Sequence, residues 1–215
     1  MYSDGISCTI LNLLKAVYDK TSYCSVISST NLENLALSHR PGLASTLTKI
    51  NCWRLFSYSK CVFLDADTLV IQNIDELFER PSFTAAPDFG WPDFFNAGVF
   101  VYEPSEEIYR SLLDLAISQE TWDGGFQGLL NHFYNDWNKL DEPYRLPFTY
   151  NVCPNAGLGY KAALKVVATN IKIIHFMGFD KPWLNISITG MPCFWAYWQY
   201  IFHHKVRKDV PKELV

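Results

Sequence analysis

The chain has 215 residues, 49% of them apolar and 19% charged, which is the composition of one globular domain with a sizeable core. Its formal net charge of -4 and the lack of a dense lysine and arginine block argue against a nucleic-acid partner. No apolar run approaches the roughly 18 residues of a membrane span, so we expect no membrane association.

Aromatic residues make up 16% of the chain, a fraction that suits a thick core or a site that stacks on sugars or bases. The six cysteines are scattered and form no CxxC pair, which favours reduced thiols in the cytoplasm over a disulfide framework. The first ten residues lack a basic stretch followed by an apolar core, so we expect no signal peptide.

The first half of the chain is predicted to alternate between helices and strands. Residues 8–19 carry apolar side chains on one helical face, and residues 23–27 are rich in residues that favour strands. Residues 43–53 again show helical spacing, and the run 60–64, which is apolar after Lys60, is typical of a buried strand.

The second half continues this alternation. Residues 83–88, 97–103 and 172–176 are predicted strands, and Ser105 is predicted to cap the helix that follows the second of them. The order of elements favours an α/β fold, a single domain over residues 1–215, with a mixed, mostly parallel sheet flanked by helices. In such sheets ligands bind beyond the carboxyl ends of the strands.

Two aspartates follow the strand at 60–64 directly, in the run FLDADTLV. Residues two apart in an extended segment point the same way, so the charges of Asp65 and Asp67 lie close together. Such a pair needs a shared proton or a cation, and a hard divalent cation is the simplest partner. A turn that caps the next segment is the alternative, and spacing alone favours it, because Asp-x-Asp is common in turns.

A histidine at the end of another predicted strand strengthens the metal interpretation. His175 lies near the end of residues 172–176, and an imidazole beside two carboxylates gives a mixed set of ligands that suits Mn²⁺ better than Mg²⁺. Taken alone, a histidine at such a position is more often a hydrogen-bonded core residue. The sequence therefore predicts a Mn²⁺ site made by Asp65, Asp67 and His175, with the structural interpretation kept open.

Several longer motifs occur in one order along the chain. They are TLTKINCW, YSKCVFLDADTLVIQNIDELFERPSFTAAPDFGWPDFFNAGVFVYEPS, WDGGFQGLLN, LPFTYN and HFMGFDKPW. In this order and spacing they resemble the glycogenins of glycosyltransferase family 8, over about residues 40–183. The resemblance implies a GT-A nucleotide-diphospho-sugar transferase fold.

The resemblance also implies an activity and its partners. It implies a glucosyltransferase that moves glucose from UDP-glucose, with retention, to a tyrosine of the protein itself or to a growing glucan, and so primes glycogen synthesis. The implied cofactor is Mn²⁺, which would act as a Lewis acid on the diphosphate. A homodimer, or a dimer with a full-length homologue, is the implied assembly.

The motifs assign roles to residues by position. Asp65, Asp67 and His175 match metal ligands that also hold UDP-glucose. Positions that match catalytic residues, which also contact the donor, are Lys49, Asp123 and Gln127. Further positions that match UDP-glucose contacts are Arg40, Ala66, Asn96, Ala97, Gly178 and Lys181. Structural alternatives are surface salt bridges for Arg40, Lys49 and Lys181, a turn for Gly178, and helix or turn caps for Asn96 and Asp123.

Two positions depart from the family pattern. The family reads D-G-G-D-Q-G where this chain has Phe126 in place of the second carboxylate. A phenyl ring accepts no bond from a sugar hydroxyl and cannot stabilise positive charge at the anomeric carbon as a carboxylate does, so reduced turnover is expected. Leu158 stands where the family has its acceptor tyrosine, and Tyr160 is either a substitute or a structural residue.

The two ends of the chain depart as well. Residues 1–39 hold no equivalent of the family's first strand and its uracil-binding loop, so they are expected to be divergent or truncated. Residues from about 190 to 215 predict an aromatic helix that packs on the domain or on a partner. Three hypotheses stay open: an active glucosyltransferase of the glycogenin type, a catalytically impaired binding partner or dimerisation subunit, and a transferase with another nucleotide sugar or an external acceptor.

Overall fold

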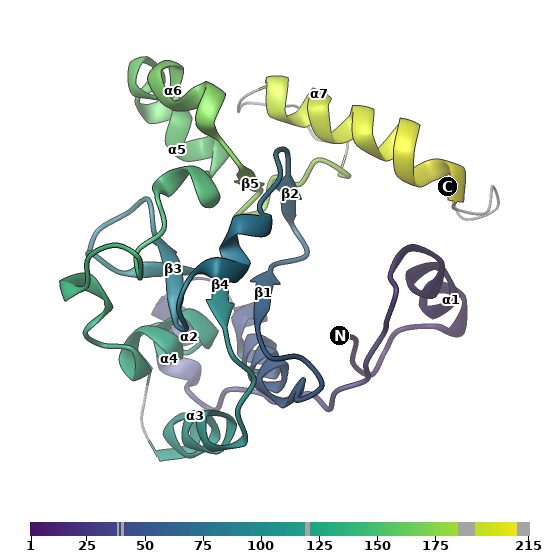
Figure 1. The fold of residues 1–215 in the computed structure, drawn as a ribbon. Helices are drawn as coiled ribbons and strands as arrows, with labels where there is room; N and C mark the ends of the chain where they lie inside the picture. The colour runs from purple at the N-terminus through teal and green to yellow at the C-terminus, as the bar shows by residue number, and fades with distance from the viewer. Residues whose placement is uncertain (38, 40, 119–120, 185–191, 210–215) are drawn as a thin grey trace.

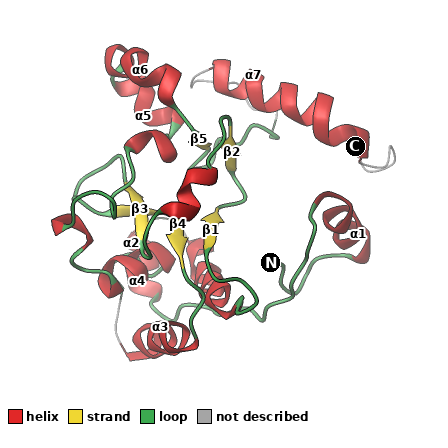
Figure 2. Ribbon diagram, viewed as in Figure 1, coloured by secondary structure: helices red, strands yellow, loops and turns green. Residues whose placement is uncertain are grey.

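Figure 1 shows the computed structural model, in which all residues are described except 38, 40, 119–120, 185–191 and 210–215. Short strands lie in the middle of the molecule with helices around them (Figure 2). The helices are α1 (Cys8–Val17), α2 (Leu32–Leu37), α3 (Glu106–Ser118), α4 (Phe126–Phe133), α5 (Pro154–Gly159), α6 (Lys161–Val167) and α7 (Pro192–Ile201). The strands are β1 (Cys61–Leu64), β2 (Thr68–Val70), β3 (Thr84–Pro87), β4 (Phe95–Tyr102) and β5 (Ile173–His175). A long 3₁₀ helix, Pro41–Arg54, precedes β1.

The strands pair in two small sheets. In the larger sheet β4 lies between β1 and β3, is antiparallel to both, and places Val99 opposite Leu64. In the smaller sheet β2 is antiparallel to β5, and Thr68 lies opposite His175. The predicted α/β class is confirmed, but the mostly parallel orientation is wrong for the described strands.

The antiparallel order has a local cause. Residues 88–94 connect β3 to β4 without a helix, and the Asp88 N–H donates to the Phe94 carbonyl at 2.8 Å. A parallel pair needs a crossover of about a dozen residues or more, whereas a short connection returns the chain as a hairpin. Because β4 runs against β1, the start of β4 lies beside the end of β1, next to the two aspartates.

Four predicted strands are confirmed as β1, β3, β4 and β5, although β1, which was predicted to be buried, is only half-buried. The helix predicted at residues 8–19 is α1, and residues 43–53 are helical as predicted, although in the 3₁₀ form. The strand predicted at residues 23–27 is wrong, since there only Tyr23 pairs, in an isolated bridge to Tyr2. A strand-forming composition is not enough where no neighbouring strand offers a ladder.

The main core fills the space between β4, the 3₁₀ helix, α3 and α4. All eight residues of β4 are buried, Asn96 among them, and the mostly apolar sequence of the strand is typical of one that is covered on both faces. Trp53 of the 3₁₀ helix stacks on Phe100 of β4 with 5.6 Å between ring centroids. Leu112 of α3 and Leu129 of α4 are fully buried in the same cluster. This core forms a fixed base for the residues at the start of β4 and of α4.

The capping of α3 follows its sequence. The Ser105 hydroxyl accepts from the Ile108 N–H at 3.3 Å, as the predicted N-cap should. We expect Ser105→Ala to lower the free energy of unfolding by about 1 kcal/mol in urea denaturation, because the Ile108 N–H then loses its partner. Ser118→Ala, at the exposed far end of α3, is the matched control and should change stability little. Equal effects of both changes would contradict the capping role.

The two ends of the chain pack differently. No residue of α1 is buried, and Ile10 and Val17 on this helix are 43% and 48% exposed. In Figure 1 the α1 segment stands apart from the central strands. The predicted C-terminal aromatic helix is confirmed as α7, where Trp195 is 6% exposed and lies 6.2 Å from the Phe176 ring. Packing on the domain is thus observed for α7.

None of the helices formed by the described residues has the length and hydropathy that a bilayer span requires.

Candidate functional site

Asp65 and Asp67 lie in the turn that joins β1 to β2, where backbone hydrogen bonds from both sheets fix them. The Asp65 N–H donates to the Gly98 carbonyl of β4 at 2.8 Å. The Asp67 carbonyl accepts from the Phe176 N–H, just after β5, at 2.9 Å. The turn therefore bridges the larger sheet and the smaller one, and its two carboxylates are held where the sheets meet.

His175 completes a cluster with the two aspartates. Its Nε2 atom lies 3.1 Å from Asp67 Oδ1 and 3.8 Å from Asp65 Oδ2, and one ligand atom from each residue lies within 4.8 Å of the others. One imidazole nitrogen and two carboxylate oxygens at this spacing are a donor set that fits a divalent cation such as Mn²⁺. The three residues that the sequence predicted as metal ligands are thus brought together.

Two lysines balance the two carboxylates. Lys49 Nζ lies 2.5 Å from Asp65 Oδ1, and Lys181 Nζ contacts both Asp67 Oδ2 and the Phe176 carbonyl. Burial raises the pKa of Asp67, but contacts with His175 and Lys181 outweigh burial and hold that pKa well below its ordinary value. The carboxylate is therefore ionised at neutral pH, which is the state that binds a metal.

A chain of side-chain amides orients His175. Its Nδ1 atom lies 2.9 Å from Asn151 Oδ1, and the Asn151 amide donates to Asn96 Oδ1 at 2.8 Å. Asn96 in turn donates to Asp88 Oδ2 at 3.1 Å and to Gln127 Oε1 at 3.0 Å. Since Nδ1 is engaged in this network, Nε2 is the nitrogen that faces the aspartates.

The cluster opens into a cavity of about 790 Å³. The predicted site residues that line it are Lys49, Asp65, Ala66, Asp67, Asn96, Ala97, Asp123, Gln127, His175, Gly178 and Lys181. Arg40 lies outside the described residues. The structure therefore gathers the described predicted residues around one space, while their individual roles stay predictions.

The carboxylate of Asp123 binds backbone N–H groups at the start of α4. Its Oδ1 accepts from the Gly125 N–H at 2.8 Å and its Oδ2 from the Gly128 N–H at 3.0 Å. A Cβ at Gly128 would lie 2.1 Å from Asp123 Oδ1, so the close approach requires glycine. Burial raises the pKa of Asp123, although the Gly125 and Gly128 N–H groups oppose the shift. The helix cap that was the structural alternative for Asp123 is therefore present, and the same residue also lines the cavity.

Phe126 follows as the first residue of α4. It is 2% exposed and belongs to the main core cluster, with its ring centroid 6.3 Å from Phe63 and 6.2 Å from Phe100. It also lines the cavity, and Lys49 Nζ lies 5.8 Å from the ring centroid. Where the family pattern has a carboxylate, this ring extends the apolar core to the cavity wall.

Sequence reasoning missed several residues of this site. Asp88 and Asn151 join the amide network, and they follow β3 and the 3₁₀ turn Phe148–Tyr150, respectively. Both residues belong to motifs on which the resemblance rests, AAPD and TYN, and those motifs could have identified them as site residues. Aromatic residues that also line the cavity are Phe89, Trp122, Phe179 and Trp183. The two possible acceptor positions stay untested: Tyr160 is 70% exposed, and the side chain of Leu158 lies outside the described part.

Gly98 provides a test of the His175 position. A Cβ at Gly98 would lie 2.2 Å from His175 Cε1, so Gly98→Ala must displace the ring. We expect the affinity for Mn²⁺ in the presence of UDP, measured by calorimetry, to fall at least about tenfold. Gly90→Ala, where a Cβ meets nothing within 4 Å, is the control and should bind like the unchanged chain. Unaltered affinity in Gly98→Ala would remove His175 from the metal site.

The fold and the site define a class. Two carboxylates and a histidine lie where two small sheets meet, at the wall of one cavity, and this arrangement is that of the GT-A glycosyltransferase fold. The chain is similar to the galactosyltransferase LgtC in complex with donor and acceptor sugar analogues (TM-score 0.57, 17% identity, 97% of this chain and 84% of that one). It is also similar to the glycosyltransferase GlyE of Streptococcus pneumoniae (TM-score 0.56, 20% identity, 97% and 62%). At these identities the similarity establishes the fold alone.

The chain belongs to Glycosyl transferase family 8, whose profile matches residues 80–187. Within the family it is similar to Glycogenin-1 of Caenorhabditis elegans, with 47% identity over 206 residues, which cover 96% of this chain and 48% of the relative. It is 49% identical over 178 residues to Glycogenin-1 of Oryctolagus cuniculus, which cover 83% of this chain and 54% of that protein. The chain thus spans about half the length of these relatives, and the glycogenin resemblance inferred from the motifs is confirmed.

Proposed function

We propose that the chain is a glucosyltransferase of the glycogenin kind, which binds UDP-glucose together with Mn²⁺ and transfers the glucose with retention. The observation that carries the proposal is the convergence of Asp65, Asp67 and His175 with Gln127 on one cavity. The acceptor is a tyrosine or a growing glucan. Similarity to glycogenins over most of the chain supports this choice of donor and product.

Asp65, Asp67 and His175 would hold the metal ion. When bound, it would neutralise the diphosphate and stabilise UDP as the leaving group. Lys49 and Lys181 already contact the carboxylates, so their ammonium groups lie close to where the phosphates would be bound. Each would offset negative charge that develops on the leaving phosphate oxygen. In this proposal the two lysines take part in the reaction, whereas the structural alternative gives them only surface salt bridges.

Asn96, Gln127 and Asp88 would face the donor sugar. Their side chains are fixed by mutual hydrogen bonds, such as Gln127 Nε2 to Asp88 Oδ2 at 2.8 Å, so they meet the sugar hydroxyls without reorganising. In the transfer, the bond from the anomeric carbon to the β-phosphate oxygen breaks and a bond to the acceptor oxygen forms on the same face. The proton of the acceptor hydroxyl passes to the departing phosphate oxygen.

A second candidate function rests on Phe126. Its burial in the core leaves no carboxylate at the position where the family pattern has one. In this reading the chain binds the nucleotide sugar but turns it over poorly, and acts as a dimerisation partner of itself or of a longer homologue. The two candidates share the donor site and differ in whether hexose is transferred.

Intact mass spectrometry distinguishes them. The purified chain is incubated with UDP-glucose and Mn²⁺, and separately with UDP-glucose and EDTA, while release of UDP is measured. The proposal predicts stepwise addition of hexose, or UDP release when a maltooligosaccharide acceptor is present, with Mn²⁺ only. Metal-dependent binding of UDP-glucose without either product would favour the impaired partner. Neither binding nor transfer would overturn both candidates.

A further inference from the structure

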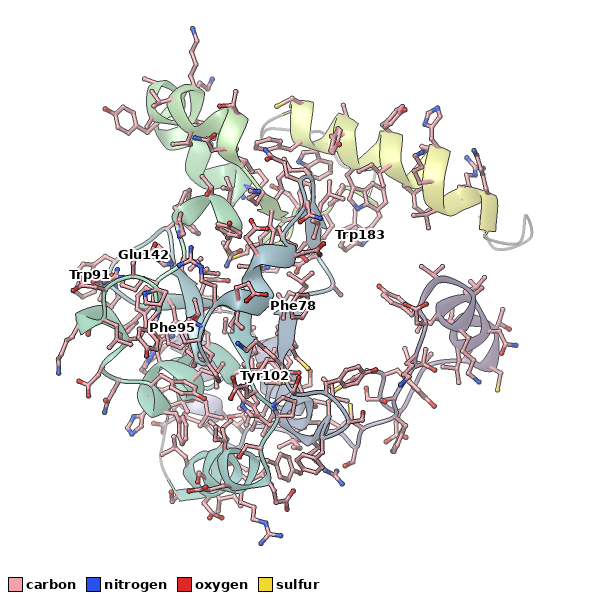
Figure 3. The ribbon with its side chains drawn as sticks, viewed as in Figure 1. Phe78, Trp91, Phe95, Tyr102, Glu142 and Trp183 are labelled. Atoms are coloured by element: carbon pink, nitrogen blue, oxygen red, sulfur yellow. The ribbon has the colours of Figure 1, made fainter. Side chains whose placement is uncertain are left out.

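One edge of the larger sheet has no strand paired with it among the described residues. β1 is an outer strand of the order β1-β4-β3, and its ladder to β4 is the one that the described residues form with it. Tyr102 of β4, labelled in Figure 3, lies opposite Cys61 at one end of this ladder. The other outer strand, β3, has a further bridge from Ala85 to Arg145. We call the side of β1 that faces away from β4 its open edge.

The register of the ladder shows which backbone groups face the open edge. The Asp65 N–H donates to the Gly98 carbonyl of β4 at 2.8 Å. In an antiparallel ladder, residues that bond to the partner strand alternate with residues whose N–H and C=O groups point away from it. Phe63 therefore bonds to β4, whereas Val62 and Leu64 point outward. No described residue forms a hydrogen bond with these outward backbone groups. They stand two residues apart, which is the spacing that a further strand requires.

The sequence of β1 does not protect this edge. Outer strands are commonly blunted by lysine, by proline or by a bulge, which prevent further strands from adding. β1 reads Cys-Val-Phe-Leu, without charge or proline, and its register with β4 is regular. All four residues are half-buried, so an added strand would both satisfy the outward backbone groups and cover apolar side chains.

The surroundings of the open edge are also apolar and uncovered. Phe56 and Tyr58, in the loop before β1, are 53% and 41% exposed. Lys20 lies over the Tyr58 ring, 5.3 Å from its centroid, so the residues that follow α1 adjoin this loop. Tyr18 and Tyr23, on either side of Lys20, are 60% and 56% exposed, and no residue of α1 is buried. An amphipathic helix usually buries its apolar face, so this part of the chain has apolar surface to spare for a partner.

The arrangement of the neighbouring segments favours a single extended segment as the partner. The α1 segment and α7 both lie on the side of β1 that faces away from β4 (Figure 1). A second copy that paired through its own β1 would have to bring the same two segments into this space. One added strand needs only the spacing of about 5 Å between neighbouring strands.

We propose that the open edge of β1 binds an extended, predominantly apolar segment of another polypeptide, which adds a strand to the larger sheet through the backbone groups of Val62 and Leu64. Neither residue lines the cavity, so the inference does not depend on the proposed function. The bound segment would lie one residue from Asp65, at the start of the turn that carries both aspartates. The open edge is therefore an interaction surface next to the donor site.

Amide hydrogen exchange, followed by NMR, tests whether the edge is open. In the free chain the Val62 and Leu64 amides should exchange at least about tenfold faster than the Phe63 amide, because only the last of these is bonded to β4. Equal protection of the three amides would show that the edge already has a partner, and would overturn the proposal.

A synthetic peptide tests the partner chemistry. Its sequence is that of β4, residues 95–102, with two lysines added at each end for solubility, because this sequence already forms a ladder with β1 on the other side. Binding should slow the exchange of the Val62 and Leu64 amides. The control peptide carries Val99→Pro, which removes an N–H group and interrupts a ladder, and should bind at least about tenfold more weakly.

Two variants of the chain locate the binding surface. Val62→Pro removes one outward N–H but no bond to β4, and should weaken peptide binding about tenfold or more. Val62→Ala keeps the N–H and should stay within about threefold of the unchanged chain. Circular dichroism and a titration with UDP and Mn²⁺ show whether each variant is folded. If Val62→Pro does not fold, the proline peptide and the exchange pattern still decide.

Three results would overturn the proposal: no binding of the peptide, equal binding of the proline peptide, or equal binding by a folded Val62→Pro. Light scattering over a range of protein concentrations examines the other occupant. A dimer of the unchanged chain that Val62→Pro abolishes would replace the proposed partner by a second copy.

Discussion

Replacing Asp67 with Asn is expected to lower the Mn²⁺-dependent affinity for UDP-glucose by a factor on the order of a hundred or more. Asp67 Oδ1 lies 3.1 Å from His175 Nε2, so it offers one of the anionic oxygens of the cluster. The amide of Asn keeps the shape of the side chain but removes its charge and replaces one oxygen by a donor. Calorimetry with UDP-glucose, with and without Mn²⁺, measures the loss.

Asp93→Asn is the matched control for this change. Asp93 is also an ion-paired aspartate, 3.0 Å from Arg145 Nη2, but its side chain is 57% exposed and it does not line the cavity. Asp93→Asn should bind UDP-glucose and Mn²⁺ as the unchanged chain does. Circular dichroism shows that both variants are folded. If a folded Asp67→Asn retained metal-dependent binding at full strength, the metal site would have to lie elsewhere.

Replacing Phe126 with Asp is expected to have two large and opposite effects. The free energy of unfolding should fall by about 3 kcal/mol or more, because a core ring packed against Phe63 and Phe100 is lost and a carboxylate is buried in its place. The rate of hexose transfer should rise at least about tenfold, because the carboxylate restores the D-G-G-D-Q-G pattern and stabilises positive charge at the anomeric carbon. Lys49 lies near enough to offset part of the buried charge.

Phe126→Asn tests whether a gain in transfer rate comes from the charge of the new carboxylate or from the room left by the lost ring. It creates nearly the same cavity and the same loss of packing but supplies no negative charge. We expect it to be destabilised like Phe126→Asp and to transfer hexose no faster than the unchanged chain, with urea denaturation and intact mass as the measurements. An equal gain for both variants would mean that room in the cavity, and not the carboxylate, limits the reaction. No gain for either would favour the impaired partner.

The sequence predicted the parts of the site that follow from apolar runs. The run at 60–64, which is apolar after Lys60, predicted a strand, and the strand placed Asp65 and Asp67 at its end. A second run placed His175 in the same way. Each inference is local, since a strand followed by paired carboxylates already needs a compensating partner. The structure brings these residues together with one histidine and two lysines as the partners.

Other features depended on the tertiary arrangement. An apolar run carries no information on strand direction, so the antiparallel order and the hydrogen bond from the Asp65 N–H to the Gly98 carbonyl were not predictable from pattern. Asp88 and Asn151 join the site only through side-chain hydrogen bonds between distant segments. The sequence identified Phe126 as a departure from the family. Its packing against Trp53, with ring centroids 6.4 Å apart, became visible only once both lay in one core.

Anomalous diffraction at the manganese edge tests the central claim most directly. Crystals of the chain grown with UDP and MnCl₂ should show one strong anomalous peak within coordination distance of Asp65, Asp67 and His175, with the diphosphate beside it and near Lys181. This result would place the metal and the nucleotide in the predicted site, whatever the rate of transfer. A well-ordered nucleotide without a peak at these three residues, or a peak elsewhere in the molecule, would contradict the account.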